Sequence, residues 1–245
     1  MAVKKRRRAA TSPIERANQK NDEDFIASYL APGAPLAVPW TARWTHPQTG
    51  AAYDVSLARS GCVGEAALET CFALIEETSR KDYDGSQQKW QPADKRREMR
   101  EADLRYILVQ EVRGEEAEEK EGETKERKGG QKEKDQSHQR IRGFTSLMPA
   151  YEEGQPVVYC YEIHLKPELQ GTGLAGLLLG FLYTIAYNLP LIAKVMLTCF
   201  LSNERALRFY RKQHFVVDPI APEIRQLRGK TVVPDYTIMS KAVRR

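Results

Sequence analysis

The chain has 245 residues, of which 41% are hydrophobic, so it is long and apolar enough to bury a core. Charged residues make up 29% of the chain, more than one compact domain needs, and we expect one folded domain with solvated extensions. The net charge of +5 comes largely from the first twenty residues, which argues against a basic face for specific nucleic-acid recognition. The longest apolar run, 174–185, is too short to cross a bilayer, so we expect no membrane partner.

Residues 1–20 contain the basic run at 4–8 and almost no apolar side chain, which predicts a disordered tail. Such a run favours nuclear import or attraction to polyanions, and a solubilising tail is the alternative. No apolar segment follows the charged start, so the pattern is not that of a secretory signal and we expect an intracellular protein.

The first half of the remaining chain, which we expect to form one domain over 21–245, alternates helical and extended patterns. A short helix is predicted over 21–30, a strand over 51–58 and an amphipathic helix over 65–80. A polar loop is expected over 83–90, then a charged helix over 92–100 and a core strand over 104–112.

Residues 114–138 form a charged, low-complexity insert with a single alanine as their apolar residue. No face of this segment can pack, and without apolar heptad positions a coiled coil is excluded. We therefore predict a mobile loop within a hairpin, whose deletion over 115–137 leaves the fold intact.

The second half begins with strands at 141–147 and 156–165, joined by a turn at 151–154. A glycine loop, a helix over 173–188, a strand over 194–200 and a helix over 203–213 follow, then strands at 214–217 and 236–240. Antiparallel strands followed by a β-α-β-α-β half predict an α/β protein with a mixed sheet.

The cysteines carry no metal signal. Cys62, Cys71, Cys160 and Cys199 lie in apolar contexts without a C-x-x-C pair or a histidine at ligand spacing. We expect reduced, buried thiols and no metal.

The glycine loop is the first candidate site. It lies between a strand and an apolar helix, so its amide groups point outward at a helix N-terminus, where a pyrophosphate binds favourably. It lacks the Lys-Ser/Thr pair of a nucleotide loop and the acidic residue of a dinucleotide fold, and tight helix packing is the structural alternative. Its residues are Gln170, Gly171, Thr172, Gly173, Leu174, Ala175 and Gly176.

A second motif accompanies this loop. The loop resembles the Gln/Arg-x-x-Gly-x-Gly/Ala signature of the GNAT superfamily of acyl-CoA-dependent acetyltransferases, and Asn203-x-x-Ala206-x-x-Phe209-Tyr210 resembles the helix that closes the coenzyme A slot in that family. The stretches KRREM at 95–99, VVYCYEIHL at 157–165 and VMLTCF at 195–200 more closely resemble the NatD-type N-terminal acetyltransferases, which modify histone tails.

This resemblance implies the GNAT acyl-CoA N-acyltransferase fold, acetyl-CoA as acetyl donor, and histones H-four and H-two-A, which begin Ser-Gly-Arg-Gly, as substrates. We expect a monomer located in the nucleus and the cytoplasm. Glu162 would accept the proton of the incoming amine, Tyr210 would protonate the leaving thiolate, and Tyr161 would take part in catalysis.

The resemblance also assigns binding roles. Tyr159 and Tyr161 share one strand face and Glu162 the other unless the strand is bulged, and we predict the bulge. The cofactor would be held by the glycine loop, by the backbone amides of Ile163, His164 and Leu165, and by Thr198 and Asn203. The substrate would be held by Tyr83, Trp90, Tyr159, Tyr161 and Tyr236.

One position departs from the NatD-type pattern. Ala150 stands where that pattern has an aspartate that pairs with the substrate arginine, and Glu152 or Glu153 would have to supply the charge. Two alternatives therefore stay open. One is acetyl transfer to lysine side chains or small polyamines, and the other is a non-catalytic coenzyme A-binding module on chromatin. At the level of residues, Trp90 could serve only in ordinary aromatic packing, and Glu162 could be an ordinary carboxylate of the strand.

Overall fold

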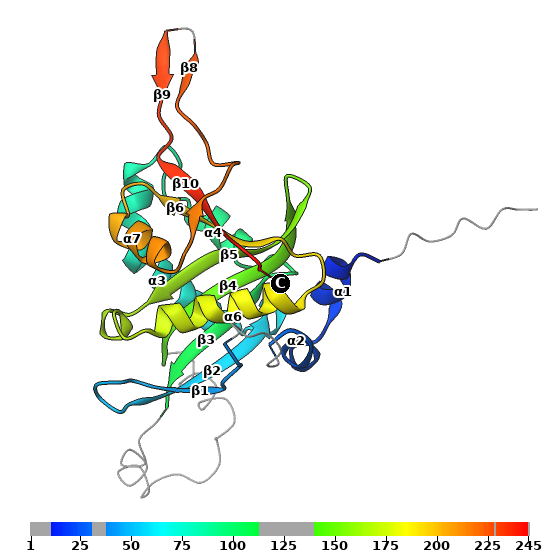
Figure 1. Cartoon of the computed structure of the whole chain (residues 1–245). Coiled ribbons are helices and arrows are strands. Elements are labelled where there is room, and N and C mark those ends of the chain that lie inside the picture. The colour runs from blue at the N-terminus through cyan, green and yellow to red at the C-terminus, as the bar shows by residue number, and fades with distance from the viewer. Residues whose placement is uncertain (1–10, 31–37, 113–139, 228, 245) are drawn as a thin grey trace, which may run out of the picture.

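The computed structural model describes residues 11–30, 38–112, 140–227 and 229–244, and Figure 1 shows them around a central sheet. The basic run at 4–8 and the insert at 114–138 lie outside the described residues. The sheet has eight strands in the order β1-β2-β3-β4-β5-β6-β10-β7. Its strands are β1 (Arg43–Thr45), β2 (Ala52–Arg59), β3 (Arg105–Glu111), β4 (Ile141–Glu152), β5 (Gln155–Leu165), β6 (Lys194–Phe200), β7 (Val216–Val217) and β10 (Tyr236–Ala242).

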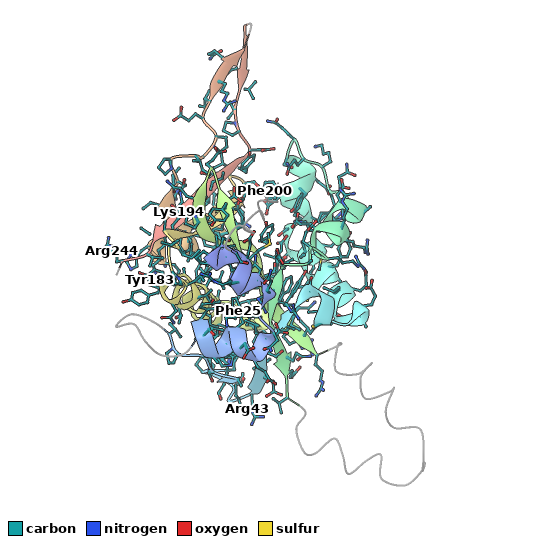
Figure 2. The ribbon with its side chains drawn as sticks, turned by 90° about the vertical axis from the view of Figure 1, so that its right-hand side faces the viewer. Phe25, Arg43, Tyr183, Lys194, Phe200 and Arg244 are labelled. Carbon is teal, nitrogen blue, oxygen red and sulfur yellow. The ribbon has the colours of Figure 1, made fainter. Side chains whose placement is uncertain are left out.

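Helices cover both faces of this sheet. Seen along the layers, α1 and α2 lie on one side with α6, while α3 and α4 lie on the other (Figure 2). Among the described helices, none has the length and apolar character that a membrane crossing requires. The helices are α1 (Pro13–Gln19), α2 (Asp22–Tyr29), α3 (Glu65–Gly85), α4 (Pro92–Glu98), α6 (Leu174–Asn188) and α7 (Glu204–Lys212).

The two faces have separate apolar cores. The larger core joins Phe25 of α2 and the leucines of α6 to inward residues of the strands, such as Leu147 and Val158. The smaller core joins Phe72 of α3 to Phe144 and its neighbours on the opposite face. Strand side chains alternate between these cores because successive residues of a strand point to opposite faces.

The mixed sheet predicted from the sequence is confirmed. All neighbouring pairs are antiparallel except β5 and β6, which run parallel from Val157↔Lys194 to Cys160↔Leu197. The α6 helix makes the crossover between these two strands, as parallel pairing requires. Beyond Cys160 the β5–β6 ladder ends, so the outer edge of β5 from 161 to 165 has no paired strand in the described part of the chain.

The tail prediction is wrong for residues 11–20, because Pro13–Gln19 form α1. Ser12 and Glu15 cap this helix reciprocally, and Pro13 occupies its first turn. The helix buries Ile14 and Ala17, and the Asn18 amide donates to the Pro149 carbonyl at 3.1 Å. A good cap and one apolar edge therefore suffice to dock a segment that is mostly polar.

A buried arginine fixes this N-terminal unit to the sheet. The Arg105 side chain on β3 is fully buried, and its guanidinium contacts Asp22 at 2.6 Å and the Lys20 carbonyl at 2.6 Å. It also lies over the Phe25 ring, 4.0 Å from the ring centroid. The chain between α1 and α2 thus compensates a charge that is costly to bury alone.

Other differences from the sequence prediction concern bounds and small elements. The amphipathic helix runs to Gly85 instead of ending at 80, so Tyr83 lies on α3 and not in a loop. Cys62 is exposed in a short 3-10 turn, which corrects the expectation that all four cysteines are buried; Cys71, Cys160 and Cys199 are buried and free. A projecting hairpin, β8 (Arg225–Leu227) with β9 (Lys230–Val232), was not predicted, nor was β1.

Candidate active site

A cavity of about 1090 Å³ opens where β5 and β6 part. Residues of α3, α4, the glycine loop and α7 complete its wall. Most residues singled out from the sequence line it: Tyr83, Tyr159, Tyr161, Glu162, Ile163, His164, Leu165, Gln170, Gly171, Gly173, Ala175, Gly176, Thr198, Asn203, Tyr210 and Tyr236. The structure therefore brings two distant sequence motifs to one place.

The predicted bulge is present in β5. Cys160 pairs with Leu147 and Glu162 with the adjacent Ser146, so Tyr161 is an extra residue in the ladder. In a regular strand without the bulge, Glu162 would lie on the face of Cys160, in the larger core. With it, Glu162 lies on the face covered by α3 and α4, together with Tyr159.

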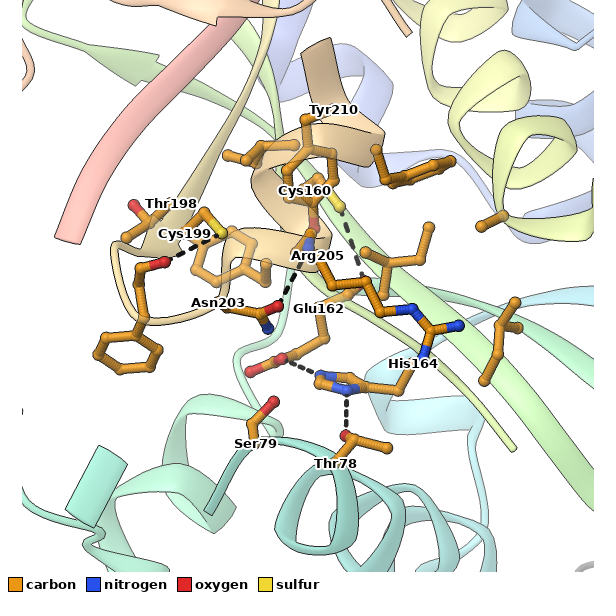
Figure 3. A pocket seen from close by; sticks show the side chains of 18 of the residues that line it. Thr78, Ser79, Cys160, Glu162, His164, Thr198, Cys199, Asn203, Arg205 and Tyr210 are labelled. Carbon is orange, nitrogen blue, oxygen red and sulfur yellow. Dashed lines mark hydrogen bonds and ion pairs between the residues drawn. The ribbon is translucent and has the colours of Figure 1, made fainter. Parts of the chain in front are cut away.

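The Glu162 carboxylate has a partner on each oxygen. Its Oε1 accepts from Lys95 Nζ at 2.8 Å, and its Oε2 lies 2.5 Å from His164 Nε2, as Figure 3 shows for the histidine. The side chain is only about a tenth exposed. Burial raises the pKa of Glu162, but the charge and hydrogen bonds of Lys95 and His164 outweigh burial and hold this pKa well below its ordinary value.

The network continues on both sides of Glu162. His164 Nδ1 lies 2.6 Å from the Thr78 hydroxyl of α3, which fixes the ring. Lys95 also contacts Glu98 at 2.8 Å and lies over the Tyr83 ring. Lys95 and Thr78 were not assigned roles from the sequence, because neither stands in a catalytic motif and only the fold brings them to β5.

Tyrosines line the part of the cavity beside this network. Tyr159 and Tyr161 lie 5.2 Å apart between ring centroids, and the Tyr159 hydroxyl contacts Thr198 Oγ1 at 2.6 Å. Burial raises the pKa of Tyr161 to about 12, and Glu152 contributes to that shift. Tyr236 faces them from β10, where it pairs with Phe200 of β6.

Glu152 is the acidic residue that the sequence left undecided. It lines the cavity at the end of β4, whereas Glu153 is not among the lining residues. Glu153 occupies the turn after β4 with a φ of 46°, next to Gly154. Of the two candidates for the missing aspartate at Ala150, only Glu152 therefore faces the cavity.

The glycine loop ends in an exposed helix N-terminus. Gly171 and Gly173 have φ angles of 79° and 91°, which glycine adopts without steric cost. The N-cap residue of α6 is Gly173, which has no side chain to cap the helix, although the Leu174 amide donates to the Thr172 hydroxyl at 3.5 Å. Gln170 lines the cavity, and its side-chain amide donates to the Leu165 carbonyl at 3.0 Å.

Three predicted site residues do not line the cavity, and each has another partner. The Thr172 hydroxyl donates to the Leu169 carbonyl at 2.6 Å, and the Leu174 side chain is fully buried in the larger core. Trp90 packs between Phe72 and Tyr83, and its indole donates to Glu76 at 3.2 Å. The assignment of these residues to cofactor or substrate therefore stays a prediction.

The α7 helix supplies positive charge that sequence reasoning missed. Arg205, Arg208 and Lys212 line the cavity from this helix, and Gln213 lies within 3.4 Å of the position of a Cβ on Gly176. The signal was available, because these cations follow Asn203 at helical spacing, but solvated helix faces carry the same pattern. Asn203 caps the helix by accepting from the Ala206 amide at 3.0 Å.

Tyr210 points from α7 to the centre of the cavity wall (Figure 3). Its side chain is buried, and burial raises its pKa well above the ordinary value, with Cys160 and Cys199 adding to the effect. The phenol therefore stays protonated at neutral pH. A protonated hydroxyl in this position is able to donate a hydrogen bond to a group in the cavity.

The cavity is electrically asymmetric in a way that fits acetyl-CoA. The glycine loop and the α7 cations suit the phosphates of coenzyme A, and the unpaired edge of β5 offers backbone groups to an amide-bearing arm. The carboxylates Glu98, Glu152 and Glu162 suit a cationic acceptor. The described residues contain no group of three or more His, Cys, Asp or Glu side chains placed to hold a metal.

The model of the acetyltransferase (GNAT) family matches residues 87–215, just over half of the chain. Solved structures resemble the chain more weakly. NAA60 of Arabidopsis thaliana with a bisubstrate analogue is 11% identical, with a TM-score of 0.47 and coverage of 77% of this chain and 97% of that one. Spermidine N-acetyltransferase of Vibrio cholerae is 15% identical, with a TM-score of 0.45 and coverage of 77% and 95%. Nothing about the acceptor follows from likenesses this weak.

Proposed function

The chain belongs to the acetyltransferase (GNAT) family, and we propose that it transfers acetyl from acetyl-CoA to the free N-terminal amine of a protein. Its expected substrates are histones H-four and H-two-A, whose mature chains begin Ser-Gly-Arg-Gly. We further propose that it acts as a monomer in the nucleus and the cytoplasm. These finer statements rest on the resemblance of 157–165 and 195–200 to NatD-type enzymes, and the cavity adds a physical argument.

The observation that carries the proposal is the position of Glu152. A substrate beginning Ser-Gly-Arg needs a carboxylate that binds a guanidinium two residues from the reacting amine. Glu152 lines the cavity, and its charge acts on both Tyr159 and Tyr161. In this proposal Glu152 pairs with the substrate arginine, a role that the methyl side chain of Ala150 cannot serve.

In this proposal the chain's own residues handle the acceptor proton. An α-amine has a pKa of about 8, so only modest help is needed to make it a nucleophile. Glu162 orients the ammonium and receives its proton, but the low pKa of its carboxyl means that it passes this proton on to water. Tyr161 extends the wall beside the acceptor.

The donor side is handled by the opposite wall. Acetyl-CoA supplies the thioester carbonyl that the amine attacks, with release of the coenzyme A thiol. The Tyr210 hydroxyl lines the cavity in protonated form and serves as the proton donor for that thiolate. The backbone of Ile163, His164 and Leu165 orients the donor along the open edge of β5.

A small polyamine is the second candidate acceptor, because Glu98, Glu152 and Glu162 place three carboxylates in one cavity. The several ammonium groups of a polyamine would neutralise these carboxylates no less effectively than the terminal amine and the arginine of a peptide. Lysine side chains present a single ammonium and are less well matched.

The test is acetyl transfer to the peptide Ser-Gly-Arg-Gly-Lys, with the same peptide blocked at its α-amine and with spermidine as parallel acceptors. Fragmentation mass spectrometry locates the acetyl group. Modification of the free N-terminus alone supports the proposal. Modification of the peptide lysine or of spermidine, with an unmodified N-terminus, rules it out.

A further inference from the structure

Lys95 is an unusual neighbour for a group that is to receive a proton from an amine. Its Nζ lies 2.8 Å from Glu162 Oε1 and 2.8 Å from Glu98 Oε1, and its side chain is only 10% exposed. Lysines are seldom buried to this extent unless they are paired. Lys95, Glu98 and Glu162 all line the cavity, so a molecule bound there is close to their charges.

The ammonium of Lys95 contacts one oxygen of Glu162, Oε1, at 2.8 Å. An acceptor nitrogen brought to Glu162 comes within reach of this charge, because Lys95 and Glu162 are in direct contact. A like charge at about 4–6 Å disfavours the protonated form of an amine, and a neutral amine is the form that attacks a thioester.

We propose that Lys95 is a fixed positive charge that favours the neutral, nucleophilic form of the bound acceptor amine. This inference rests on the proposed function only in taking Glu162 as the group that meets the acceptor. The acceptor ammonium loses one proton, which passes by way of Glu162 to water. The freed lone pair forms the new C–N bond while the thioester C–S bond breaks.

Lys95 does not itself become the acceptor. Burial lowers the pKa of Lys95, but the charges of Glu162 and Glu98 outweigh burial and raise this pKa above its ordinary value. The side chain therefore keeps its proton and has no lone pair to attack with. Titratable groups face Lys95 and its partner Glu162 from each element packed on them: Tyr83 from α3, Glu98 from α4, Tyr106 from β3, and Glu162 and His164 from β5.

The first test is the pH dependence of kcat in wild type, Lys95→Met and Lys95→Arg, with the acceptor peptide at saturation. Lys95→Met should move the acid limb of the profile upward by about one pH unit or more and regain most of the rate at high pH. Lys95→Arg retains the charge and should leave the limb in place. An equal loss at every pH in Lys95→Met would mean a structural role and overturn the proposal.

Arg97→Met is the matched control, since Arg97 lies on the same helix, has a side chain that is 76% exposed and forms an ion pair with Asp94 at 2.9 Å. Its pH profile should match that of wild type. Thermal melting of all variants shows whether α4 remains docked.

A second test is independent of turnover. Calorimetric titration of the enzyme–coenzyme A complex with the peptide, in buffers of different ionisation enthalpy at pH 7, counts protons released on binding. Wild type and Lys95→Arg should release about half a proton more than Lys95→Met, because the α-amine with a pKa of about 8 enters mostly protonated. If the peptide does not bind, the proposed substrate is wrong, and spermidine is the probe for Lys95. Equal proton release in wild type and Lys95→Met would overturn the inference, measured at pH 7 for the peptide and at about pH 9.5 for spermidine, because alkylamines have a pKa of about 10.

Discussion

Replacement of Glu162 by glutamine separates the chemical role of this residue from its role in packing. The carboxylate is about a tenth exposed and contacts Lys95 at 2.8 Å and His164 at 2.5 Å. Removing one member of a buried ion pair costs about 3–5 kcal/mol. Glutamine keeps the shape of the side chain and one hydrogen-bond acceptor for Lys95, and Lys95 retains its ion pair with Glu98. We therefore expect the free energy of unfolding to fall by about 1–2 kcal/mol.

A loss of this size lowers the melting temperature by roughly 2–8 °C, given about 2–4 °C per kcal/mol for a domain of this length. The catalytic loss should be larger. Positioned proton transfer contributes about 10²–10⁴-fold, so kcat/KM for the peptide should fall at least about 100-fold at pH 7, equivalent to about 2.7 kcal/mol of barrier. Between pH 7 and pH 9 the deficit should shrink about tenfold, because the α-amine then loses its proton unaided.

The assay is initial-rate acetylation of the peptide with paired melting curves. Glu111→Gln is the control, since Glu111 forms a partly exposed pair with Arg142 at 2.9 Å, is absent from the cavity lining and should change stability by about 0.5 kcal/mol or less. A Glu162→Gln enzyme within threefold of wild type at pH 7 would refute the reasoning. Coenzyme A binding without turnover in wild type would instead favour the non-catalytic module.

Three further predictions concern Glu152, the cations of α7 and the buried Arg105. Glu152→Gln should raise KM about tenfold for Ser-Gly-Arg-Gly-Lys and leave KM unchanged for Ser-Gly-Ala-Gly-Lys; equal effects on both peptides would exclude an arginine contact. Arg205→Ala combined with Lys212→Ala should raise the dissociation constant of coenzyme A about tenfold while that of dephosphorylated pantetheine stays constant, as measured by calorimetry. Arg105→Met should lower the free energy of unfolding by about 2–4 kcal/mol in urea, because Asp22 and the carbonyl groups between α1 and α2 lose their partner; a change under about 1 kcal/mol would contradict a role for this pair in docking α1.

Sequence patterns predicted the sheet and most of its helices because those elements bury regular faces. The helix over 65–80 was confirmed as the first three-quarters of α3, whose buried residues recur at helical spacing. Its last turn, with Tyr83, is polar and offers no such period. The α1 helix was missed for the opposite reason, since its cap is strong but only one narrow edge is apolar.

The candidate site was predictable where its residues belong to contiguous sequence motifs. A bulge in this strand was predicted from the resemblance to the GNAT family, and the ladder shows it at Tyr161. Lys95 and Thr78 were not predictable, because their partners lie 67 and 86 residues away. For Trp90 the sequence left packing and substrate contact open, and the contact with Tyr83 shows the packing.

The bulge also determines what the loss of one residue from β5 would do to the residues that follow it. Tyr161 is the unpaired residue of the bulge, so its loss would give a regular ladder in which Cys160 stays opposite Leu147 and Glu162 stays opposite Ser146. Glu162 and the residues after it would then keep both their partners on β4 and their faces. The loss of one residue just after Glu162, in the regular part of the ladder, would instead exchange the faces of the residues that follow it.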